Sequence, residues 1–536
     1  MITADKKAGS NPTAAGPGPG VAAAAATGPP LGAANQNDHH FSTAHLLHDL
    51  KGRTISSGIV TAASQTVLFV LTLGSTMVLA RLLRPVDYGL VAMVLTVLGF
   101  LRAFKDVGLS IATVQREGIT HAQVSNLFWI NIAVSGLISL LVASAAPVIA
   151  WFYHEPRLVT ITLALAVGFV LEGSTIQHMA LLNRQMRFKT IALIQIGALL
   201  AAVTVGVVMA FLGCGYWSLV GLQLTTPAML FLLTWSASRW RPQRFVPGSG
   251  TRPLLKFGAN LTVGSLVWSF ARGSDSLLIG RFYGADSVGL YTRAAALLNR
   301  PMEQFLVPIA AVFVPVFSRV QSQTERYRRT FLQLFEAIAL ITFFLTALFF
   351  ALAKPLTLVV LGPQWEKAAL IFASFTIGAL CYPFCAVCTW LYQSQGRGRD
   401  SLKASLVGSA VSFCSYVAGL HWGPAGVAVS CSTAGVLILL PIIYRIAGKS
   451  GPVTTSDLWI GFLRQLPVWA VVCAATFAAR ALVPAAKPIT QLLVCAPLGL
   501  LGGAAFILSF PPSRRVAFNL LSILQLIKRR GEISAN

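Results

Sequence analysis

The chain has 536 residues, of which 55% are hydrophobic and only 11% are charged, and its mean hydropathy is +0.71. These proportions exclude a soluble globular domain and indicate an integral membrane protein. An excess of Lys and Arg (41) over Asp and Glu (17) gives a formal net charge of +24. The basic residues are divided among short loops and form no single patch, so we expect no nucleic-acid partner.

Residues 1–41 are rich in Ala, Gly and Pro and have no apolar periodicity, which predicts a disordered tail. The opening stretch lacks the apolar core of a signal peptide, so we expect the first membrane helix to remain as an anchor. Four histidines lie ahead of the first predicted membrane helix, at His39, His40, His45 and His48. A metal site there is the less favoured interpretation, and an amphipathic segment at the membrane interface is the simpler one.

Apolar stretches long enough to cross a hydrocarbon core, about 20 residues each, recur along the rest of the chain. We expect fourteen of them to be membrane-spanning helices, in an all-α protein. They are 56–80, 87–112, 122–151, 158–182, 190–212, 216–238, 255–279, 287–317, 331–353, 368–393, 402–420, 423–446, 458–483 and 488–510. The spans 87–112 and 287–317 carry charges inside and are the least regular.

The distribution of Lys and Arg between alternate loops predicts the orientation. If the N-terminus is cytoplasmic, the cytoplasmic segments hold most of the basic residues, for example Arg184, Arg187 and Lys189 in one loop. The opposite loops hold few. Basic residues are retained on the cytoplasmic side, so we expect both termini in the cytoplasm.

Two interrupted apolar stretches, 78–93 and 278–293, align with each other without a gap at a constant offset of 200 residues. This alignment suggests an internal repeat. The matching pairs are Arg81 and Arg281, Gly89 and Gly289, and Leu90 and Leu290. Three matches alone are also compatible with chance recurrence of common turn residues. Two parallel six-helix units are a usual build of secondary transporters. We expect a tail at 1–41, six-helix bundles at 42–245 and 246–450, two further helices at 451–512, and a basic amphipathic cytoplasmic tail at 513–536.

Ionisable residues inside the predicted spans are the candidate functional groups, because such residues are costly in hydrocarbon. Guanidinium groups suit phosphate oxygens through paired hydrogen bonds. The candidates for substrate binding are Arg102, Lys105, Arg272, Arg293 and Arg300. The candidates for coupling to H⁺ or Na⁺ are Asp106, Glu172, Asp275 and Glu303. Structural ion pairs are the alternative for Arg102 with Asp106, Arg272 with Asp275 and Arg300 with Glu303. The alternative for Arg293 is that its side chain snorkels to the periplasmic interface, and the alternative for Glu172 is a role in helix packing.

Several motifs in order resemble the signature stretches of polysaccharide transporters. They are "LARLLRPVDYGLVAM", "FKDVGLSIATVQREGIT", "WFYHEPRL", "HMALLNRQMRFK", "GYWSLV", "SRWRP", "DSLLIGRFYGADSVGLYTRA" and "VFVPVFSRVQ". The resemblance covers about residues 50–450. It is to the Wzx-type lipid-linked oligosaccharide flippases of the multidrug/oligosaccharidyl-lipid/polysaccharide export superfamily. The long N-terminal tail departs from that pattern.

The resemblance implies two six-helix bundles in a V around a central cavity, with two appended helices. It implies a bacterial inner-membrane flippase that carries undecaprenyl-diphosphate-linked oligosaccharide from the cytoplasmic to the periplasmic leaflet for exopolysaccharide, capsule or O-antigen synthesis. A polysaccharide polymerase and a chain-length regulator are further candidate partners. We expect no cofactor and no catalytic residue.

Two other functions remain open. A cation-coupled multidrug exporter of the same superfamily would share the fold, but the embedded arginines favour an anionic cargo. A polysaccharide polymerase or ligase would need a sizeable external loop with catalytic groups, whereas the external loops here are short.

The run "CYPFCAVC" has the C-x3-C-x2-C spacing of some iron–sulfur sites. Because it lies in an apolar span, small side chains for helix packing are the simpler explanation, and we expect no metal site.

Overall fold

The computed structural model describes residues 50–102, 109–116, 118–247, 252–483 and 486–519. The described residues are almost entirely helical and include no strand, which confirms an all-α membrane protein. The predicted tail at 1–41, the four N-terminal histidines, Lys105, Asp106 and residues 520–536 lie outside these ranges.

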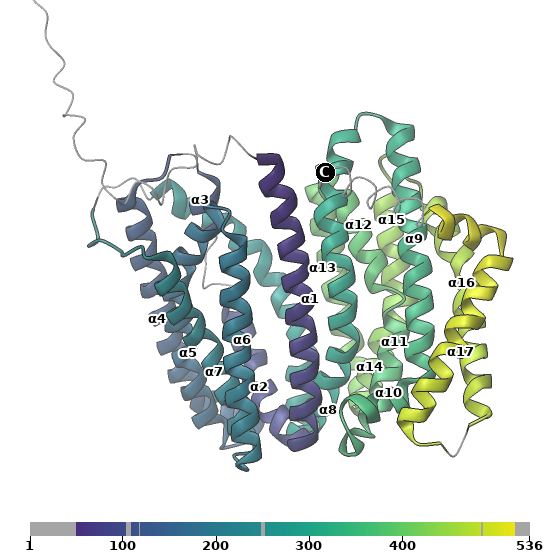
Figure 1. The fold of residues 1–536 in the computed structure, drawn as a ribbon, viewed down its shortest axis with the longest axis horizontal. Coiled ribbons are helices and arrows are strands. Elements are labelled where there is room, and N and C mark those ends of the chain that lie inside the picture. Colours follow the sequence, from purple (N-terminus) through teal and green to yellow (C-terminus); the bar gives the residue numbers. More distant parts are fainter. Residues whose placement is uncertain (1–49, 103–108, 117, 248–251, 484–485, 520–536) are drawn as a thin grey trace, which may run out of the picture.

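The first seven helices form one group, which we call the first bundle (Figure 1). They are α1 (Leu50–Leu82), α2 (Pro85–Arg102), α3 (Leu109–Gln115), α4 (His121–Tyr153), α5 (Leu158–Arg184), α6 (Phe188–Phe211) and α7 (Tyr216–Ser238). Within it, α4 packs on α5, α5 and α6 pack on α7, and α1 packs on α6.

The next eight helices form the second bundle. They are α8 (Arg252–Val320), α9 (Thr324–Ala351), α10 (Ala353–Val360), α11 (Ala368–Gly378), α12 (Tyr382–Ser394), α13 (Gly398–Gly419), α14 (Gly423–Ala434) and α15 (Leu440–Gly448). A π-helical segment, Gly435–Leu439, joins α14 to α15. The last helices, α16 (Thr455–Ala481) and α17 (Pro488–Ser509), pack on each other and on α9 at the edge of the molecule (Figure 1).

Twelve segments of the described chain are long and apolar enough to cross a membrane. Two of these segments each contain two successive helical stretches. Gly273–Val320 bends at Gly284, whose φ of 74° and ψ of −176° are not helical. Gly398–Gly448 contains α13 and, after a turn, α14 and α15. When both are divided, the segments correspond to the fourteen spans that the sequence predicts.

The predicted span 87–112 is described only in part. α2 covers Pro85–Arg102 and α3 covers Leu109–Gln115, and residues 103–108 between them lie outside the described ranges. The described stretch of α2 has 18 residues and is about 27 Å long.

Matching turns on the two bundles support the internal repeat. The backbone N–H of Arg187 donates to Leu182 O at 3.0 Å, and that of Arg397 donates to Tyr392 O at 2.9 Å. The guanidinium of Arg187 donates to the carbonyl of Ala237 near the end of α7, and that of Arg397 donates to the carbonyl of Ala447 near the end of α15. In the sequence, Ala237 follows Arg187 by the same number of residues as Ala447 follows Arg397. Two copies of one helical unit inserted in the same direction would produce this correspondence.

Candidate functional site

The two bundles meet along a seam, which we define as the contact between α2 and α8. A β-carbon added to Gly89 would overlap the carbonyl oxygen of Ala285, and one added to Gly289 would overlap the carbonyl oxygen of Pro85. Glycine therefore lets the helix backbones touch at this point, as small residues do in many membrane helix pairs. Farther along α8, a β-carbon on Gly273 would lie 3.0 Å from the ring of Phe100 in α2.

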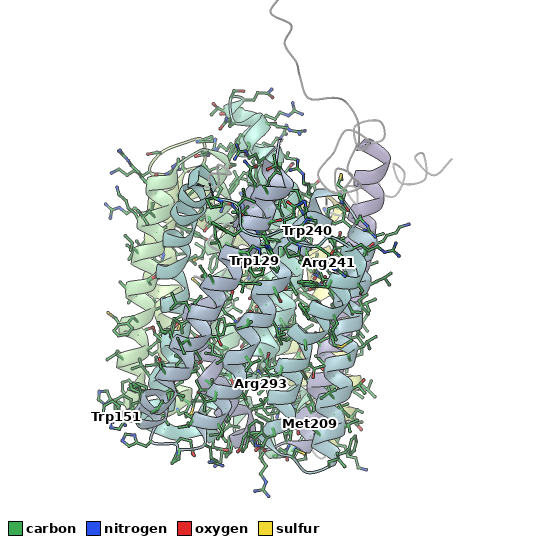
Figure 2. All side chains as sticks on the ribbon, turned by 90° about the vertical axis from the view of Figure 1, so that its left-hand side faces the viewer. Trp129, Trp151, Met209, Trp240, Arg241 and Arg293 are labelled. Carbon is green, nitrogen blue, oxygen red and sulfur yellow. The ribbon has the colours of Figure 1, made fainter. Side chains whose placement is uncertain are left out.

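Arg293 lies in this seam. Its guanidinium carbon is 4.9 Å from the centre of the Tyr88 ring in α2, a cation–π geometry. Its Nε is buried and has no hydrogen-bond partner, and no carboxylate among the described residues forms a salt bridge with it. Figure 2 shows Arg293 between the ends of the helices, nearer to the end with Trp151 than to the end with Trp240. The seam thus contains a half-buried guanidinium whose Nε is enclosed and which has no carboxylate partner among the described residues.

The end of the seam beside Tyr88 is closed by contacts between the bundles. The Tyr88 ring packs edge-on against Trp365, with ring centres 5.3 Å apart. The indole Nε1–H of Trp365 donates to Ala80 O at 2.8 Å. Because Trp365 belongs to the second bundle and Ala80 to the first, these contacts join the two bundles at one membrane face.

The repeated arginines of the two interrupted stretches make reciprocal contacts. Arg81 of the first bundle donates from Nη2 to Val359 O of the second bundle at 2.8 Å. Arg281 of the second bundle has its guanidinium 5.9 Å from the ring centre of Phe152, which belongs to the first bundle. Each arginine therefore reaches across to the other bundle at the same end of the seam.

Arg102, a predicted substrate ligand, is paired. Its Nη2 lies 3.4 Å from Oε1 of Glu172 in α5, and the two side chains are 45% and 20% exposed. The sequence analysis weighed a pair between Arg102 and Asp106 instead. Asp106 lies outside the described residues, and the partner that the structure gives is on another helix. Sequence spacing along one helix could not have indicated it.

The remaining basic candidates differ in what the structure says of them. Arg300 is an exposed residue in the second leg of α8, two turns after Arg293. The side chain of Arg272 and all of Lys105 lie outside the described part. Of the predicted substrate ligands, the structure therefore describes the surroundings of Arg102, Arg293 and Arg300.

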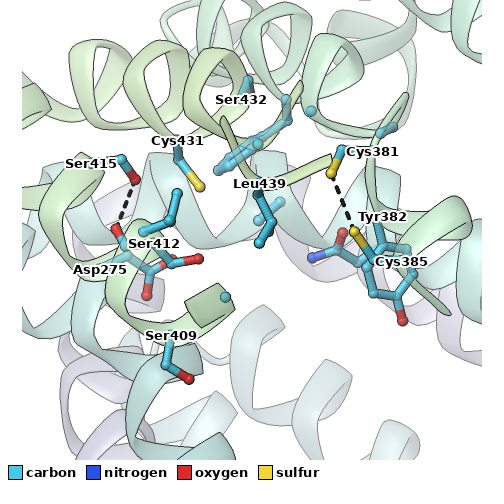
Figure 3. Close-up of a pocket in the computed structure, with 18 of the residues that line it drawn as sticks. Asp275, Cys381, Tyr382, Cys385, Ser409, Ser412, Ser415, Cys431, Ser432 and Leu439 are labelled. Atoms are coloured by element: carbon cyan, nitrogen blue, oxygen red, sulfur yellow. Dashed lines mark hydrogen bonds between the residues drawn. The ribbon is translucent and has the colours of Figure 1, made fainter. Parts of the chain in front are cut away.

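A cavity of about 400 Å³ lies within the second bundle, between α8, α11, α12, α13 and α14 (Figure 3). Two predicted coupling residues, Asp275 and Glu303, line it together. The other polar lining residues are Tyr291, Asn299, Tyr382, Thr389, Tyr392, Ser405, Ser409, Ser412, Ser415, Tyr416 and Ser432. None of the predicted arginines whose side chain is described lines this cavity, so it is acidic and rich in hydroxyl groups.

Asp275 is held in place by two hydrogen bonds. The hydroxyl of Tyr291 donates to its Oδ2 at 3.0 Å, and the backbone N–H of Ser276 donates to its Oδ1 at 2.6 Å. A carboxylate oxygen accepts more than one hydrogen bond, so both oxygens keep capacity for a ligand. Glu172, the third described coupling candidate, lies in the first bundle beside Arg102 and not in this cavity.

The sequence analysis missed the serines of α13. Ser405, Ser409 and Ser412 line the cavity and follow one another at i, i+4 and i+7. This spacing places them on one face of a helix, a pattern that was visible in the sequence as a polar stripe in an apolar span.

The cysteines of "CYPFCAVC" lie in and just before α12. The Sγ atoms of Cys381 and Cys385 are 3.4 Å apart, and Cys388 is buried. Across the described ranges, no three His, Cys, Asp or Glu side chains are grouped closely enough to hold a metal ion.

The chain resembles known proteins in both sequence and fold. The model of a family described as "Polysaccharide biosynthesis protein" matches residues 78–370, more than half of the chain. It is 28% identical over 274 residues to "Teichuronic acid biosynthesis protein TuaB" of Bacillus subtilis (strain 168), covering 51% of this chain and 57% of that protein. It is 25% identical over 320 residues to "Lipopolysaccharide biosynthesis protein WzxC" of Escherichia coli (strain K12), covering 59% and 65%.

These matches span less than two thirds of the length of either relative. Among solved structures, the fold resembles "Lipid II flippase MurJ, inward closed conformation", with a TM-score of 0.62 and 14% identity. That comparison covers 84% of this chain and 98% of the other. At this identity the likeness concerns the fold alone.

Proposed function

The chain belongs to the polysaccharide biosynthesis protein family, whose model matches residues 78–370, and on that basis we propose that it is a flippase for lipid-linked oligosaccharide. The proposed substrate is an undecaprenyl-diphosphate-linked repeat unit. The proposed direction is from the cytoplasmic to the periplasmic leaflet of the bacterial inner membrane, with both termini in the cytoplasm. The product would supply the synthesis of exopolysaccharide, capsule or O-antigen.

The observation that carries the proposal is the half-buried guanidinium of Arg293 in the seam, which has no carboxylate partner among the described residues. A diphosphate and a sugar cannot cross hydrocarbon unaided, because charges and unpaired hydroxyls are too costly there. A partly buried guanidinium without a carboxylate partner is costly too, unless an anion neutralises it. An anionic headgroup that enters between the bundles would provide that neutralisation and would gain paired hydrogen bonds.

Other basic residues extend this proposed anion path. Arg300 is on the same face of α8 as Arg293, since residues seven apart lie two turns along a helix. Arg102 would contact the diphosphate by exchanging Glu172 for the substrate. Arg272 and Lys105 remain proposed contacts on sequence grounds alone.

The driving force has two proposed components. An inside-negative membrane potential favours outward movement of an anion by about 2.3 kcal/mol per charge per 100 mV. Among the four candidate coupling carboxylates, Asp275 and Glu303 are the two that share a cavity, and we propose Asp275 as the site for H⁺ or Na⁺. Asp106 and Glu172 are the remaining candidates. Transport that is unaffected by both proton and sodium gradients would remove this coupling proposal.

A multidrug exporter is a second candidate, because the acidic lining of the cavity in the second bundle would suit a cationic compound. Charge separates the two functions: the flippase needs the arginine of the seam, and the exporter needs the carboxylates of the cavity. Neighbouring polymerase and chain-length regulator proteins remain proposed partners of the flippase function.

Reconstituted vesicles test the proposal. The full chain is inserted in liposomes that carry undecaprenyl diphosphate linked to a labelled disaccharide, and a membrane-impermeant lectin measures the sugar on the outer leaflet. We expect the protein to accelerate exchange of the labelled lipid between leaflets. Protein that leaves this exchange unchanged but lowers the internal concentration of a cationic dye would favour the exporter.

A further inference from the structure

We propose that the cavity in the second bundle binds a neutral sugar ring of the transported glycolipid, while the diphosphate lies on the neighbouring arginines of α8. This inference rests on the proposed function and assigns a separate subsite to the glycan. It concerns the part of the cavity formed by Ser405, Ser409 and Asn299, away from Asp275.

The size of the cavity favours an organic ligand. A volume of about 400 Å³ lies in the range of small-molecule sites, whereas one water molecule takes about 30 Å³ in the liquid. A cation at Asp275 would fill a small part of it. From Ser415 beside Asp275 to Ser405, the lining of α13 extends ten residues, or about 15 Å. The space is therefore an elongated groove along one helix face.

The serine hydroxyls at the far end of the groove are available to a ligand. Many helical serines here, including Ser415, donate to a carbonyl three or four residues earlier. Neither Ser405 nor Ser409 has a hydrogen-bond partner among the residues that the structure describes. A hydroxyl both donates and accepts, which matches the mixed donor and acceptor character of a sugar hydroxyl.

Other lining groups complete a surface suited to a sugar. Asn299 supplies an amide that both donates and accepts. The ring of Tyr382 is exposed and lines the same cavity, so it offers an apolar face beside the polar groups. Pockets of this kind, with a few placed polar groups among apolar surface, are typical of small-molecule sites.

The groove is next to the proposed diphosphate site. Asn299 and Glu303 line the groove. Arg300 directly follows Asn299 in the sequence and precedes Glu303 by three residues. All three therefore lie within about one helical turn, or 5.4 Å along α8. A sugar linked directly to a diphosphate is a single short unit, so its two halves would need adjacent subsites like these.

The charge of the groove restricts the sugar. Asp275 and Glu303 both line it, and Arg102 and Arg293 do not. A uronic acid beside Asn299 would place a carboxylate near Glu303, one helical turn along α8, without a cation from the described arginines of the seam. Like charges at short range are unfavourable where water is scarce, so the groove favours a neutral ring.

Binding to the full chain in lipid nanodiscs tests the inference, with native mass spectrometry as the readout. The probes are undecaprenyl diphosphate and the same lipid linked to glucose or to glucuronic acid. We expect the glucose lipid to bind about tenfold more tightly than the bare diphosphate, as one or two added hydrogen bonds allow. Ser409→Leu should abolish this preference and leave the affinity for the bare lipid unchanged. Cys414→Leu, at an exposed residue of α13 outside the cavity, is the matched control.

Each outcome decides a different point. An equal affinity of the wild type for bare and glucose lipids, an unchanged preference in Ser409→Leu, or equal binding of glucuronate and glucose lipids would overturn the inference. Failure of the wild type to bind any of the three lipids would instead contradict the proposed function. If Ser409→Leu unfolds, the double variant Ser405→Ala and Ser409→Ala, which adds no bulk, should lower the preference for glucose severalfold.

Discussion

Gly89 and Gly289, which occupy the same place in the two repeated stretches, pack against each other's helix at the seam between the bundles. A β-carbon on Gly289 would lie 3.1 Å from the backbone nitrogen of Gly89 and would overlap Pro85 O, while one on Gly89 would overlap Ala285 O. Pro85 and Ala285 are likewise equivalent positions of the repeat. The contact is therefore reciprocal, as expected where two copies of one unit meet about a pseudo-twofold axis.

We predict that Gly89→Ala disrupts this seam. Its methyl group would meet a backbone carbonyl, which cannot move aside as a flexible side chain can, and overpacking of this kind costs about 1–3 kcal/mol. Thermal unfolding in detergent should show a lower midpoint than for the wild type. Gly99→Ala is the control in the same helix, because nothing lies within 4 Å of its added β-carbon. Equal midpoints for the two variants would contradict the packing described.

The pair formed by Arg102 and Glu172 allows a test of whether Arg102 stabilises the fold or binds the substrate. At a distance of 3.4 Å and with 45% exposure of the arginine, the pair should contribute only about 0–1 kcal/mol to stability. The double variant Arg102→Gln and Glu172→Gln removes both charges and should unfold near the wild-type temperature. We expect its glycolipid exchange in vesicles to fall about tenfold or more. Wild-type exchange by the double variant would mean that Arg102 is a structural residue only.

Arg397 should matter more for stability than its counterpart Arg187. Its guanidinium donates to Asp400, Gln395 and three backbone carbonyls, those of Ile446, Ala447 and Ser450. Arg187 donates one hydrogen bond of 3.3 Å at an exposed site. Loss of several partly buried, charged hydrogen bonds should cost about 2 kcal/mol or more in total, and loss of one exposed bond about 1 kcal/mol. Arg397→Ala should therefore lower the unfolding midpoint clearly more than Arg187→Ala does, measured side by side; similar shifts would argue against this clamp.

The loop between α4 and α5 should add a small stability that depends on pH. Hydrogen bonds from Arg157 lower the pKa of the Glu155 carboxyl below its ordinary value. A carboxyl with a lowered pKa stabilises the fold above its unfolded pKa of about 4.3, and this contribution is lost as the pH falls through the folded pKa. Because Arg157 is 48% exposed, the effect should stay below about 1 kcal/mol. Glu155→Gln should be slightly less stable than the wild type at neutral pH and equally stable in strong acid; a difference that grows in acid would contradict the sign.

The sequence was sufficient for the membrane class and for the places of most apolar spans. Apolar runs of about 20 residues are a strong signal, because hydrocarbon allows few alternatives to the helix. The constant offset between the two interrupted stretches also pointed to Gly89 and Gly289, which the structure places in one contact. The spacing of two repeated stretches and the length of an apolar run are read directly from the sequence, so a single chain can report them.

Pairings between distant helices were not accessible from the sequence. Among the described residues, Arg102 pairs with Glu172 on α5, a helix distant in the sequence. Asp275 and Glu303 share a cavity that none of the described arginines lines. Helical spacing identifies residues that share a face, but which face meets which is set by tertiary packing. For the same reason the stripe of Ser405, Ser409 and Ser412 gained meaning only beside Asn299 and Tyr382.

The most direct test of the account is transport by variants of Arg293, the half-buried guanidinium in the seam. In vesicles that carry the labelled undecaprenyl diphosphate disaccharide, Arg293→Ala should reduce leaflet exchange by about a hundredfold, since it removes a charged group that binds phosphate through paired hydrogen bonds. Arg293→Lys, which keeps the charge and loses the planar fork, should retain part of the exchange. Wild-type exchange by correctly folded Arg293→Ala would contradict the claim that an anionic headgroup passes through this seam.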